Sequence, residues 1–333
     1  MPVDRTPYVV VIPSLSRNTY NRRRGDVRAI RPATLDSRVD VSVYTGMTNA
    51  MNHLAKRRLG RTELMATEIG LGGAWLQGRK HDRTHEEGAA VVRHALARGI
   101  NYVDTAECYG ESELVVGQAL EGYEGECFLA TKFGHVPGEF DFSRESVLKS
   151  VERSMKRLRN RPIDLLQLHT PPEPDWERLS APGGAFQGMR EARERGWCRF
   201  LGTTGNDVAF LRRCVETDLF DTMLVFLRYD LMDRTAEPLI KEAFARDIGI
   251  ILASPLRMGL LGAAREEMRS DLTAEVSAQL SALELQYNDE PGGLPVAAMR
   301  FALGCREAST VLTGATSIQD VDQTLSTGRI QPG

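Results

Sequence analysis

Short apolar segments alternate with amphipathic segments from Leu59 almost to the C-terminus. The apolar runs occupy residues 67–73, 100–104, 127–132, 163–169, 198–204, 222–227, 249–255 and 309–314. The segments between them repeat apolar residues with the helical period. In ESVLKSVERSMKRL (145–158), Val147, Val151 and Leu158 recur on one face and charged residues lie opposite. The pattern predicts eight strands, each followed by a helix.

This alternation indicates the fold class. Continuous apolar runs are typical of strands buried on both faces, and strict alternation of strand and helix implies parallel pairing. Eight such units match a (β/α)8 barrel. The alternative, an open doubly wound sheet, requires G-x-G-x-x-G after its first strand, and GLGGAW (70–75) lacks that spacing. We therefore expect an α/β protein with a single TIM barrel over residues 54–333.

The first 53 residues differ from the rest of the chain. They contain eight arginines, three of them consecutive at positions 22–24, and little apolar periodicity. Arg and Ser richness fits a targeting segment, but four aspartates interrupt it and YVVVI is too short for a secretory signal. We expect residues 1–53 to be a disordered extension. Because Met47 and Met51 are alternative starts, its place in the native protein stays open.

Composition and charge limit the classes of partner. The chain is 42% hydrophobic and 26% charged, with a formal net charge of -3 and a pI near 6.1, which favours neither nucleic acid nor an anionic membrane as partner. Five cysteines without a C-x-x-C pair favour reduced thiols and a cytoplasmic location, and indicate no metal site. No apolar run approaches the roughly 20 residues that span a bilayer.

Four chemically active side chains follow consecutive predicted strands. Asp104 ends the second strand and Tyr109 lies in the loop beyond it, while Lys132 ends the third strand and His169 the fourth. Each of them has a structural explanation as a cap, a packing residue or a solvated strand end. In a (β/α)8 barrel, however, the carboxyl ends of all the strands share one rim, where active sites are built. We therefore expect these four residues to converge.

The four residue types make chemical sense together. A phenol has a pKa near 10, which a neighbouring ammonium lowers, and a carboxylate can hold that ammonium in place. An imidazole can hydrogen-bond a carbonyl oxygen. This set can move the proton of a carbonyl or alcohol oxygen but supplies no hydride, so it implies a nicotinamide cofactor, NAD or NADP.

At these motifs the chain resembles the aldo-keto reductase superfamily, over roughly Leu59 to Thr324. The resemblance rests on DTAECYG (104–110), ATKFG (130–134) and LQLHTPP (166–172). It implies that Tyr109 is the general acid/base, Lys132 lowers its pKa, Asp104 pairs with Lys132, and His169 orients the substrate oxygen. Motifs such as RFLGTTG and ASPLRMGLL are similar to those of the L-galactose and D-threo-aldose dehydrogenases.

The resemblance also implies where an extended cofactor would lie. Its phosphates would meet the loop after the seventh strand, and its adenosine the loop after the eighth. The implied cofactor-binding residues are Gly72, Gly73, Thr204, Gly205, Asn206, Phe226, Ser254, Pro255, Leu256, Gly259, Leu261, Gly314, Ala315, Thr316, Asp320 and Gln323. Trp75, Tyr109 and His169 are the implied substrate contacts, with Trp176 as a further candidate for the pocket wall.

Two departures from the family pattern concern the cofactor. Many relatives hold the nicotinamide carboxamide with Ser-Asn and Gln, where this chain has Thr204, Gly205 and Phe226, and a phenyl ring cannot replace an amide's hydrogen bonds. Many NADP-using relatives carry a cation at the position of Thr316. Its absence, with a carboxylate at Asp320, favours NAD, although Arg257 or Arg265 could supply a substitute charge.

The predicted function is hydride transfer between NAD(P) and an aldose or another small aldehyde, ketone or alcohol. One alternative is an NADPH-dependent carbonyl reductase of secondary metabolism. Another is a cofactor-sensing binding subunit with little turnover, as a resemblance to potassium-channel β-subunits allows. The sequence leaves the oligomeric state open.

Overall fold

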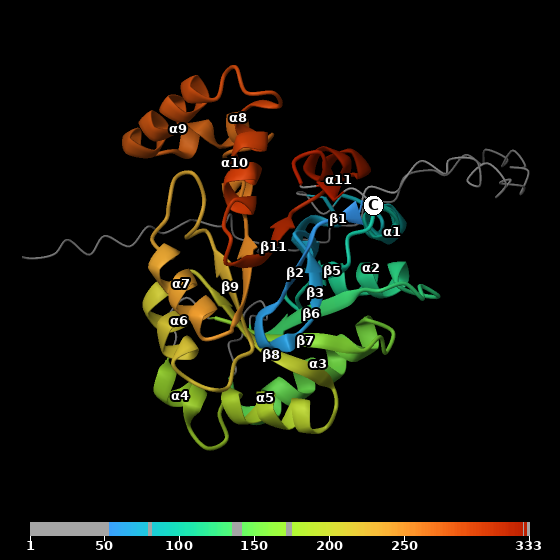
Figure 1. Cartoon of the computed structure of the whole chain (residues 1–333). Coiled ribbons are helices and arrows are strands. Elements are labelled where there is room, and N and C mark those ends of the chain that lie inside the picture. Colours follow the sequence, from blue (N-terminus) through green and yellow to red (C-terminus); the bar gives the residue numbers. More distant parts are fainter. Residues whose placement is uncertain (1–52, 79–81, 135–141, 171–174, 329, 332–333) are drawn as a thin grey trace, which may run out of the picture. The chain divides into compact units, whose positions relative to one another are not determined.

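In the computed structural model, eight parallel strands form a closed barrel in the order β10-β11-β4-β5-β6-β7-β8-β9 (Figure 1). The structure describes residues 53–78, 82–134, 142–170, 175–328 and 330–331, so the predicted extension, apart from His53, lies outside the described residues. The barrel strands are β4 (Ile69–Gly72), β5 (Tyr102–Asp104), β6 (Phe128–Phe133), β7 (Ile163–His169), β8 (Cys198–Gly205), β9 (Thr222–Phe226), β10 (Gly249–Ala253) and β11 (Ala308–Thr313). The eight predicted strands and the barrel are confirmed.

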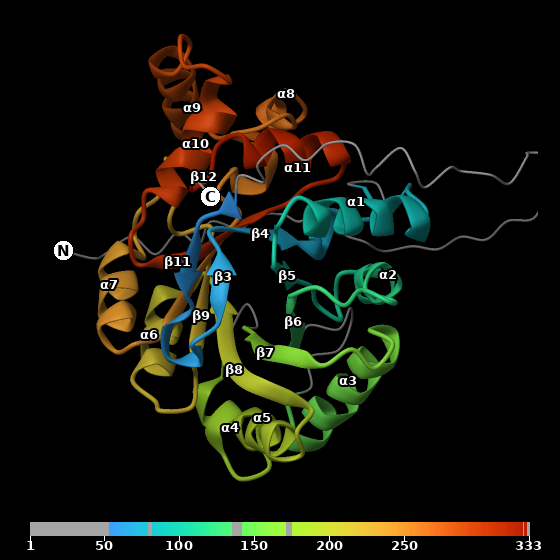
Figure 2. The same cartoon turned by 45° about the vertical axis from the view of Figure 1, so that its right-hand side comes forward.

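Helices surround the barrel, as Figure 2 shows for α1, α2, α3, α5, α6 and α7. The helices that follow the strands are α1 (His85–Ala97), α2 (Ser112–Ala119), α3 (Arg144–Arg157), α4 (Trp176–Ser180), α5 (Ala185–Glu194), α6 (Val208–Val215), α7 (Glu237–Ala245), α10 (Gly293–Leu303) and α11 (Ile318–Leu325). Their apolar faces and the outward side chains of the strands form one large hydrophobic core.

Local chemistry accounts for the helix ends. Thr84 and Glu87 form a capping box at the start of α1. Gly99 follows α1 with a φ of 92°, a left-handed conformation that favours glycine, and the amide of Ile100 donates to the carbonyl of Ala95 at 3.0 Å. The chain can therefore turn directly into β5.

A second hydrophobic cluster fills the barrel interior. Tyr102, Leu165, Leu224 and Leu312 belong to it and are buried, and they come from four different strands. The floor of the barrel is a hairpin of β2 (Lys56–Arg58) and β3 (Met65–Thr67), with η2 (Gly60–Thr62) between them. Because Leu59 and Leu64 of this hairpin pack in the interior cluster, the hairpin closes the N-terminal end of the barrel, and a site is expected at the opposite end, where the strands have their carboxyl ends.

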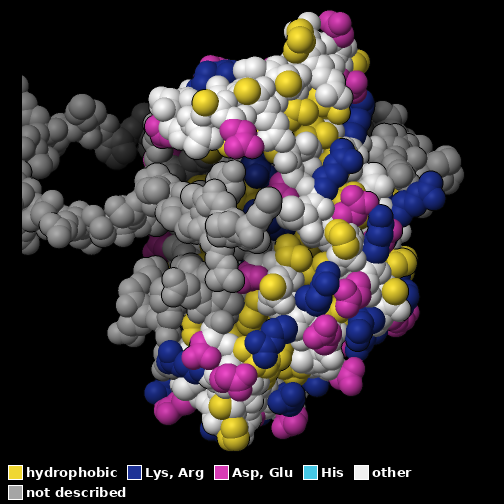
Figure 3. All heavy atoms as spheres, turned by 90° about the vertical axis from the view of Figure 1, so that its left-hand side faces the viewer, with side chains coloured by type: hydrophobic (Ala, Val, Ile, Leu, Met, Phe, Trp, Pro, Cys, Tyr) yellow, Lys and Arg dark blue, Asp and Glu magenta, His cyan; other side chains and the backbone are white. Residues whose placement is uncertain are grey.

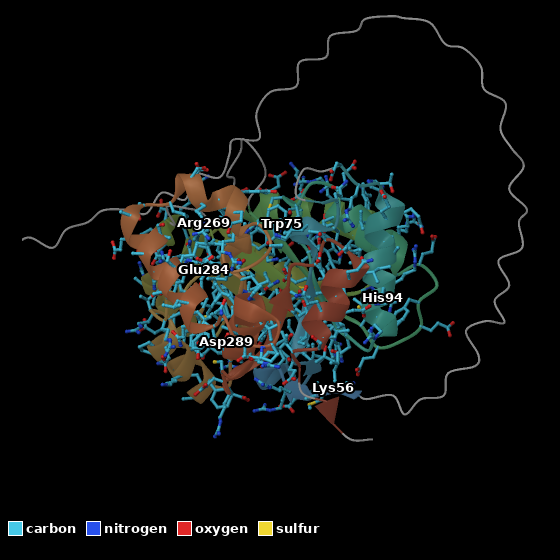
Figure 4. The ribbon with its side chains drawn as sticks, turned by 90° about the horizontal axis from the view of Figure 1, so that it is seen from above. Lys56, Trp75, His94, Arg269, Glu284 and Asp289 are labelled. Atoms are coloured by element: carbon cyan, nitrogen blue, oxygen red, sulfur yellow. The ribbon has the colours of Figure 1, made fainter. Side chains whose placement is uncertain are left out.

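Besides the hairpin of β2 and β3, two further features were not anticipated from the sequence. Between β10 and α10 the chain forms α8 (Arg265–Met268), η5 (Arg269–Asp271) and α9 (Ala274–Gln286), which share a separate hydrophobic cluster with Leu260, Leu261 and Leu294. In this excursion Arg269 and Glu284 form an ion pair at 2.7 Å (Figure 4). A two-stranded pairing of β1 (His53–Leu54) with β12 (Ile330–Gln331) also brings the ends of the described chain together.

The face shown in Figure 3 carries basic and acidic side chains interspersed with one another. On α6 and α7, Arg212 lies 3.5 Å from Glu242, and Lys241 lies 2.7 Å from Glu237. Within the described residues, no helix has the length and apolar character needed to cross a membrane.

Candidate active site

Four polar side chains meet at the carboxyl ends of three neighbouring strands. Asp104 is the last residue of β5, Lys132 lies one residue before the end of β6, and His169 is the last residue of β7. Tyr109 lies in the loop between β5 and α2. Because β5, β6 and β7 are hydrogen-bonded neighbours, these positions converge as the sequence predicts.

Asp104 and Lys132 form a buried ion pair. Their side chains are 3% and 2% exposed, and the Lys132 ammonium donates a hydrogen bond to Asp104 Oδ1. Lys132 Nζ also donates to the carbonyl of Thr105 at 2.9 Å. Burial alone would lower the pKa of Lys132, but the Asp104 carboxylate and the Tyr109 phenol outweigh that effect, so the pKa is raised. The ammonium of Lys132 therefore stays protonated beside the Tyr109 phenol.

Tyr109 lies between this cation and the imidazole. Lys132 Nζ is 4.7 Å from the centroid of the Tyr109 ring, and the ring meets the His169 ring edge-on with centroids 6.0 Å apart. Burial raises the pKa of Tyr109 to about 12, and the Lys132 ammonium opposes this rise. The sequence predicts the direction of the lysine's effect on this pKa, but burial has the larger effect.

Cys108 contacts a ring nitrogen of His169. Its Sγ lies 3.3 Å from His169 Nδ1, and burial raises the pKa of the thiol to about 12. A thiol that keeps its proton can donate to Nδ1, which then acts as the acceptor and leaves the ring proton on Nε2.

The loop after β10 has an unusual backbone. Ser254, Arg257 and Met258 have φ values of 57°, 47° and 57°, in the left-handed region that side chains other than glycine rarely adopt. Arg257 donates to Asp230 Oδ2 at 2.6 Å, and Asp230 is fully buried in the loop after β9. This ion pair ties the two loops together and occupies Arg257, one of the two candidate substitute cations.

The loop after β11 directs its hydrogen-bond donors at a carboxylate of the chain itself. Asp320 Oδ2 accepts bonds from the Thr316 amide at 2.8 Å, the Thr316 hydroxyl at 2.7 Å and the Ser317 amide at 3.0 Å. Asp320 and Ser317 thereby form the capping box of α11. The second candidate cation, Arg265, lies with its Nε 2.9 Å from Glu284 and is also paired.

The comparison with known proteins identifies the family of this chain. The model of the aldo/keto reductase family matches residues 68–331, which includes all eight barrel strands and all four rim residues. The chain belongs to the aldo/keto reductase family. It is therefore a member of an oxidoreductase family, and the resemblance drawn from the sequence motifs is confirmed.

Curated relatives agree with the branch suggested by the motifs. The chain is 27% identical to L-galactose dehydrogenase of Arabidopsis thaliana over 284 residues, covering 83% of this chain and 88% of the relative. It is 28% identical to D-threo-aldose 1-dehydrogenase of Pseudomonas sp over 283 residues, covering 74% and 85%. The solved structure of an aldo-keto reductase from Bacillus halodurans, in its holo form, aligns with a TM-score of 0.70 at 24% identity, covering 84% of this chain and 92% of that one, and supports the fold.

The positions expected to lie near the nicotinamide carboxamide are found at the carboxyl ends of β8 and β9. The buried Thr204 hydroxyl donates to the carbonyl of Leu168 at 3.1 Å. Gly205 ends β8, and an added Cβ there would lie 3.1 Å from Thr170. The carbonyl of the exposed Asn206 accepts from Arg228 at 2.9 Å. Phe226 packs on the interior cluster as a half-buried wall residue.

The remaining predicted cofactor residues lie along the same rim. Gly73 must lack a side chain, because an added Cβ would lie 2.7 Å from Ser112 Oγ. Gly72 is the last residue of β4, Gly314 follows β11, and Gln323 is exposed on α11. In the loops, Pro255, Leu261 and Ala315 are buried, whereas Leu256 and Gly259 are partly exposed.

The two tryptophan candidates differ in position. Trp75, in η3 (Gly73–Trp75), lies against the rim (Figure 4), where an added Cβ on Gly314 would lie 3.0 Å from its indole. Trp176 instead packs edge-on against Phe186 of α5 and Phe210 of α6. Its contacts belong to the helix layer, which corrects the interpretation of Trp176 as a pocket wall.

One polar residue of the site was missed in the sequence. Gln167 of β7 is fully buried, and its Nε2 donates to Asp104 Oδ2 at 2.7 Å. The available signal was its place two residues before His169, since alternate residues of a strand face the same side. Among the described residues, no group of three His, Cys, Asp or Glu side chains could hold a metal ion.

Proposed function

We propose that this aldo/keto reductase transfers hydride between a nicotinamide cofactor and the carbonyl or carbinol carbon of an aldose or another small aldehyde or ketone, with Tyr109 as the general acid/base. The observation that carries the proposal is the buried Asp104–Lys132 ion pair beside Tyr109. A buried ion pair is expensive to maintain, and replacement by apolar residues is often neutral or stabilising. Its position next to a phenol gives it a catalytic purpose.

Each residue has a distinct task. In the oxidative direction the Tyr109 phenolate accepts the hydroxyl proton of the substrate, and in the reductive direction the phenol returns it to the carbonyl oxygen. Lys132 stabilises the phenolate, and Asp104 keeps Lys132 charged and in place. His169 donates from Nε2 to the substrate oxygen and so orients the reacting carbon. Nicotinamide would accept or supply the hydride.

Residues that could bind a dinucleotide lie in the loops at the carboxyl ends of the barrel strands. The loop 254–261 would hold the diphosphate and the loop 314–323 the adenosine, with Phe226 and Trp75 as apolar walls for the ring end. Phe226 can stack on a nicotinamide ring but cannot hydrogen-bond its carboxamide.

The complete set of Asp104, Tyr109, Lys132 and His169 favours an enzyme over a binding subunit, because a protein that only senses cofactor has no need for a proton donor.

The direct test is a spectrophotometric screen in which the protein is offered NAD and NADP with a panel of aldoses, simple alcohols and aldehydes. We expect reduction of the cofactor with at least one aldose. Tight cofactor binding without turnover on any member of the panel would contradict the proposed function and favour the binding subunit.

We further propose that NAD is preferred to NADP. The 2′-phosphate of NADP carries close to two negative charges and requires free donors or a cation. Thr316 and Ser317 direct three donors at Asp320, and Arg257 and Arg265 are each paired. A 2′-phosphate would have to displace an internal carboxylate of the same sign of charge.

Dissociation constants of the two oxidised cofactors test this preference. We expect NAD to bind more tightly in the wild type, and Asp320→Asn or Thr316→Arg to strengthen NADP binding selectively. Asp322→Asn is the matched control, because it removes a charge from the same helix where Asp322 pairs with His94 and Arg98. Tenfold tighter binding of NADP by the wild type, about 1.4 kcal/mol, would contradict the preference.

A further inference from the structure

Gln167 contacts the carboxylate of Asp104, the partner of Lys132. It occupies an inward position of β7 and is fully buried. Its Nε2 donates to Asp104 Oδ2 at 2.7 Å, while Asp104 Oδ1 accepts from Lys132. Both carboxylate oxygens of Asp104 are therefore held, one by an amide and one by an ammonium, and the carboxylate cannot rotate without losing a charge-assisted bond.

The contact between Gln167 and Asp104 adds a fifth residue to the four that form the proposed site. Lys132 Nζ also donates to the carbonyl of Thr105, and it lies 4.7 Å from the centre of the Tyr109 ring. A chain of contacts thus runs from Gln167 through Asp104 and Lys132 to Tyr109. A change in the orientation of Asp104 would move the ammonium relative to the phenol, and with it the stabilisation of the phenolate.

Stability alone does not explain an amide at this position. Gln167 Oε1 is buried and has no hydrogen-bond partner among the described residues. An acceptor buried without a partner costs free energy of folding, a cost that an apolar side chain of similar length would not carry. The benefit of the amide is its bond to Asp104.

We propose that Gln167 is a positioning residue of the hydride-transfer site, holding the Asp104 carboxylate so that Lys132 stays against Tyr109. The inference rests on the proposed function for the role of Tyr109. It concerns orientation only, since Gln167 is fully buried and contacts Asp104.

The kinetic test uses Gln167→Met, which removes the donor and keeps the length of the side chain. We expect kcat to fall about tenfold or more, the change associated with losing a hydrogen bond to a charged group, with the dissociation constant of NAD unchanged within about twofold. Thr310→Val is the matched control, because its hydroxyl is also buried in the barrel without a partner but lies on β11. A wild-type kcat in Gln167→Met would overturn the inference.

Gln167→Glu provides a second variant of nearly the same shape. Its protonated carboxyl can donate to Asp104, whereas its ionised form would repel it. Relative to the wild type at the same pH, kcat of Gln167→Glu should therefore recover as the pH is lowered, and that of Gln167→Met should not. Equal pH dependence of the two variants would contradict a role for the donor.

A measurement without substrate separates this inference from the proposed function. Alkaline ionisation of Tyr109, identified as the component lost in Tyr109→Phe, can be followed by ultraviolet difference absorbance after a rapid pH jump. We expect ionisation at higher pH in Gln167→Met than in the wild type or Thr310→Val. Identical ionisation in all three would refute the positioning role, whereas failure of the wild type to reduce NAD or NADP would refute only the proposed function.

Discussion

Burial raises the pKa of the Tyr109 phenol, whereas one neighbouring cation, Lys132, lowers it. The sequence predicts the cation, because Lys132 ends the strand beside Asp104, and the structure agrees with the predicted direction of its effect. It does not predict the net result, because the extent of burial depends on residues from other strands. Burial raises the pKa of Tyr109 to about 12, so the phenol keeps its proton at neutral pH.

This raised pKa predicts different pH dependences for the two directions of reaction. Oxidation needs the phenolate, so its rate should rise with pH between about 7 and 10. Reduction needs the phenol, so its rate should stay level over the same range. Lys132→Met removes the cation that opposes the rise in pKa and should move the oxidative rise to still higher pH. Rate profiles at saturating cofactor test this, and an oxidative rate that falls with pH would contradict it.

Other residues also depend on information from the fold. The sequence gives Asp320 as a carboxylate near the adenosine end, but only the capping box of α11 explains why it faces Thr316. Likewise, nothing in the sequence distinguishes Trp75, which lies against Gly314, from Trp176, which packs on Phe186. Sequence motifs therefore predict which residue types form the site. The neighbours of each side chain depend on contacts between segments far apart in the sequence.

At the scale of elements, apolar runs bounded by polar turns were sufficient to predict the eight barrel strands. The run 67–73 contains a break, because Thr67 ends β3 and β4 begins only at Ile69. The hairpin was missed because β2 reads KRR, which lacks the apolar alternation of a strand. The α8–α9 excursion was missed because it packs on its own small cluster outside the repeating pattern.

We expect Arg57 to fasten the β2–β3 hairpin to the barrel and so to contribute to the free energy of unfolding. It donates to the carbonyls of Leu303, Cys305 and Ala308 at 2.7–2.8 Å, and to the buried Glu68 at 3.2 Å. Arg57→Met should lower the free energy of unfolding by about 3 kcal/mol, since it leaves a buried carboxylate without this cation. Chemical denaturation measures the loss, with Lys56→Met, which removes an exposed ion pair to Glu126, as a control of small effect. Equal stability of the two variants would contradict this role.

At the scale of the whole molecule, closure of the barrel assembles the site. Asp104, Lys132 and His169 are separated by 28 and 37 residues along the chain and meet because β5, β6 and β7 are neighbours. Recognition of the (β/α)8 pattern therefore predicts their convergence without any atomic detail.

Residues 1–52 should be dispensable for folding and activity, because the segment lacks apolar periodicity and precedes the first paired strand, β1. We expect a protein that begins at His53 to keep the melting temperature and the turnover of the full chain. A protein that begins at Leu59 is the control, since it also loses β2 and Arg57 and should be clearly less stable. A large drop in melting temperature on removal of residues 1–52 alone would contradict the prediction.

The most direct measurement compares Tyr109→Phe with the wild type in NAD reduction and in NAD binding. The substitution removes the phenolic oxygen while keeping the ring that meets His169. We expect turnover to fall by about 100- to 10,000-fold, the usual contribution of general acid/base help, with the dissociation constant of NAD nearly unchanged. Turnover within a few-fold of the wild type would contradict the central claim that Tyr109, held beside the Asp104–Lys132 pair, transfers the proton.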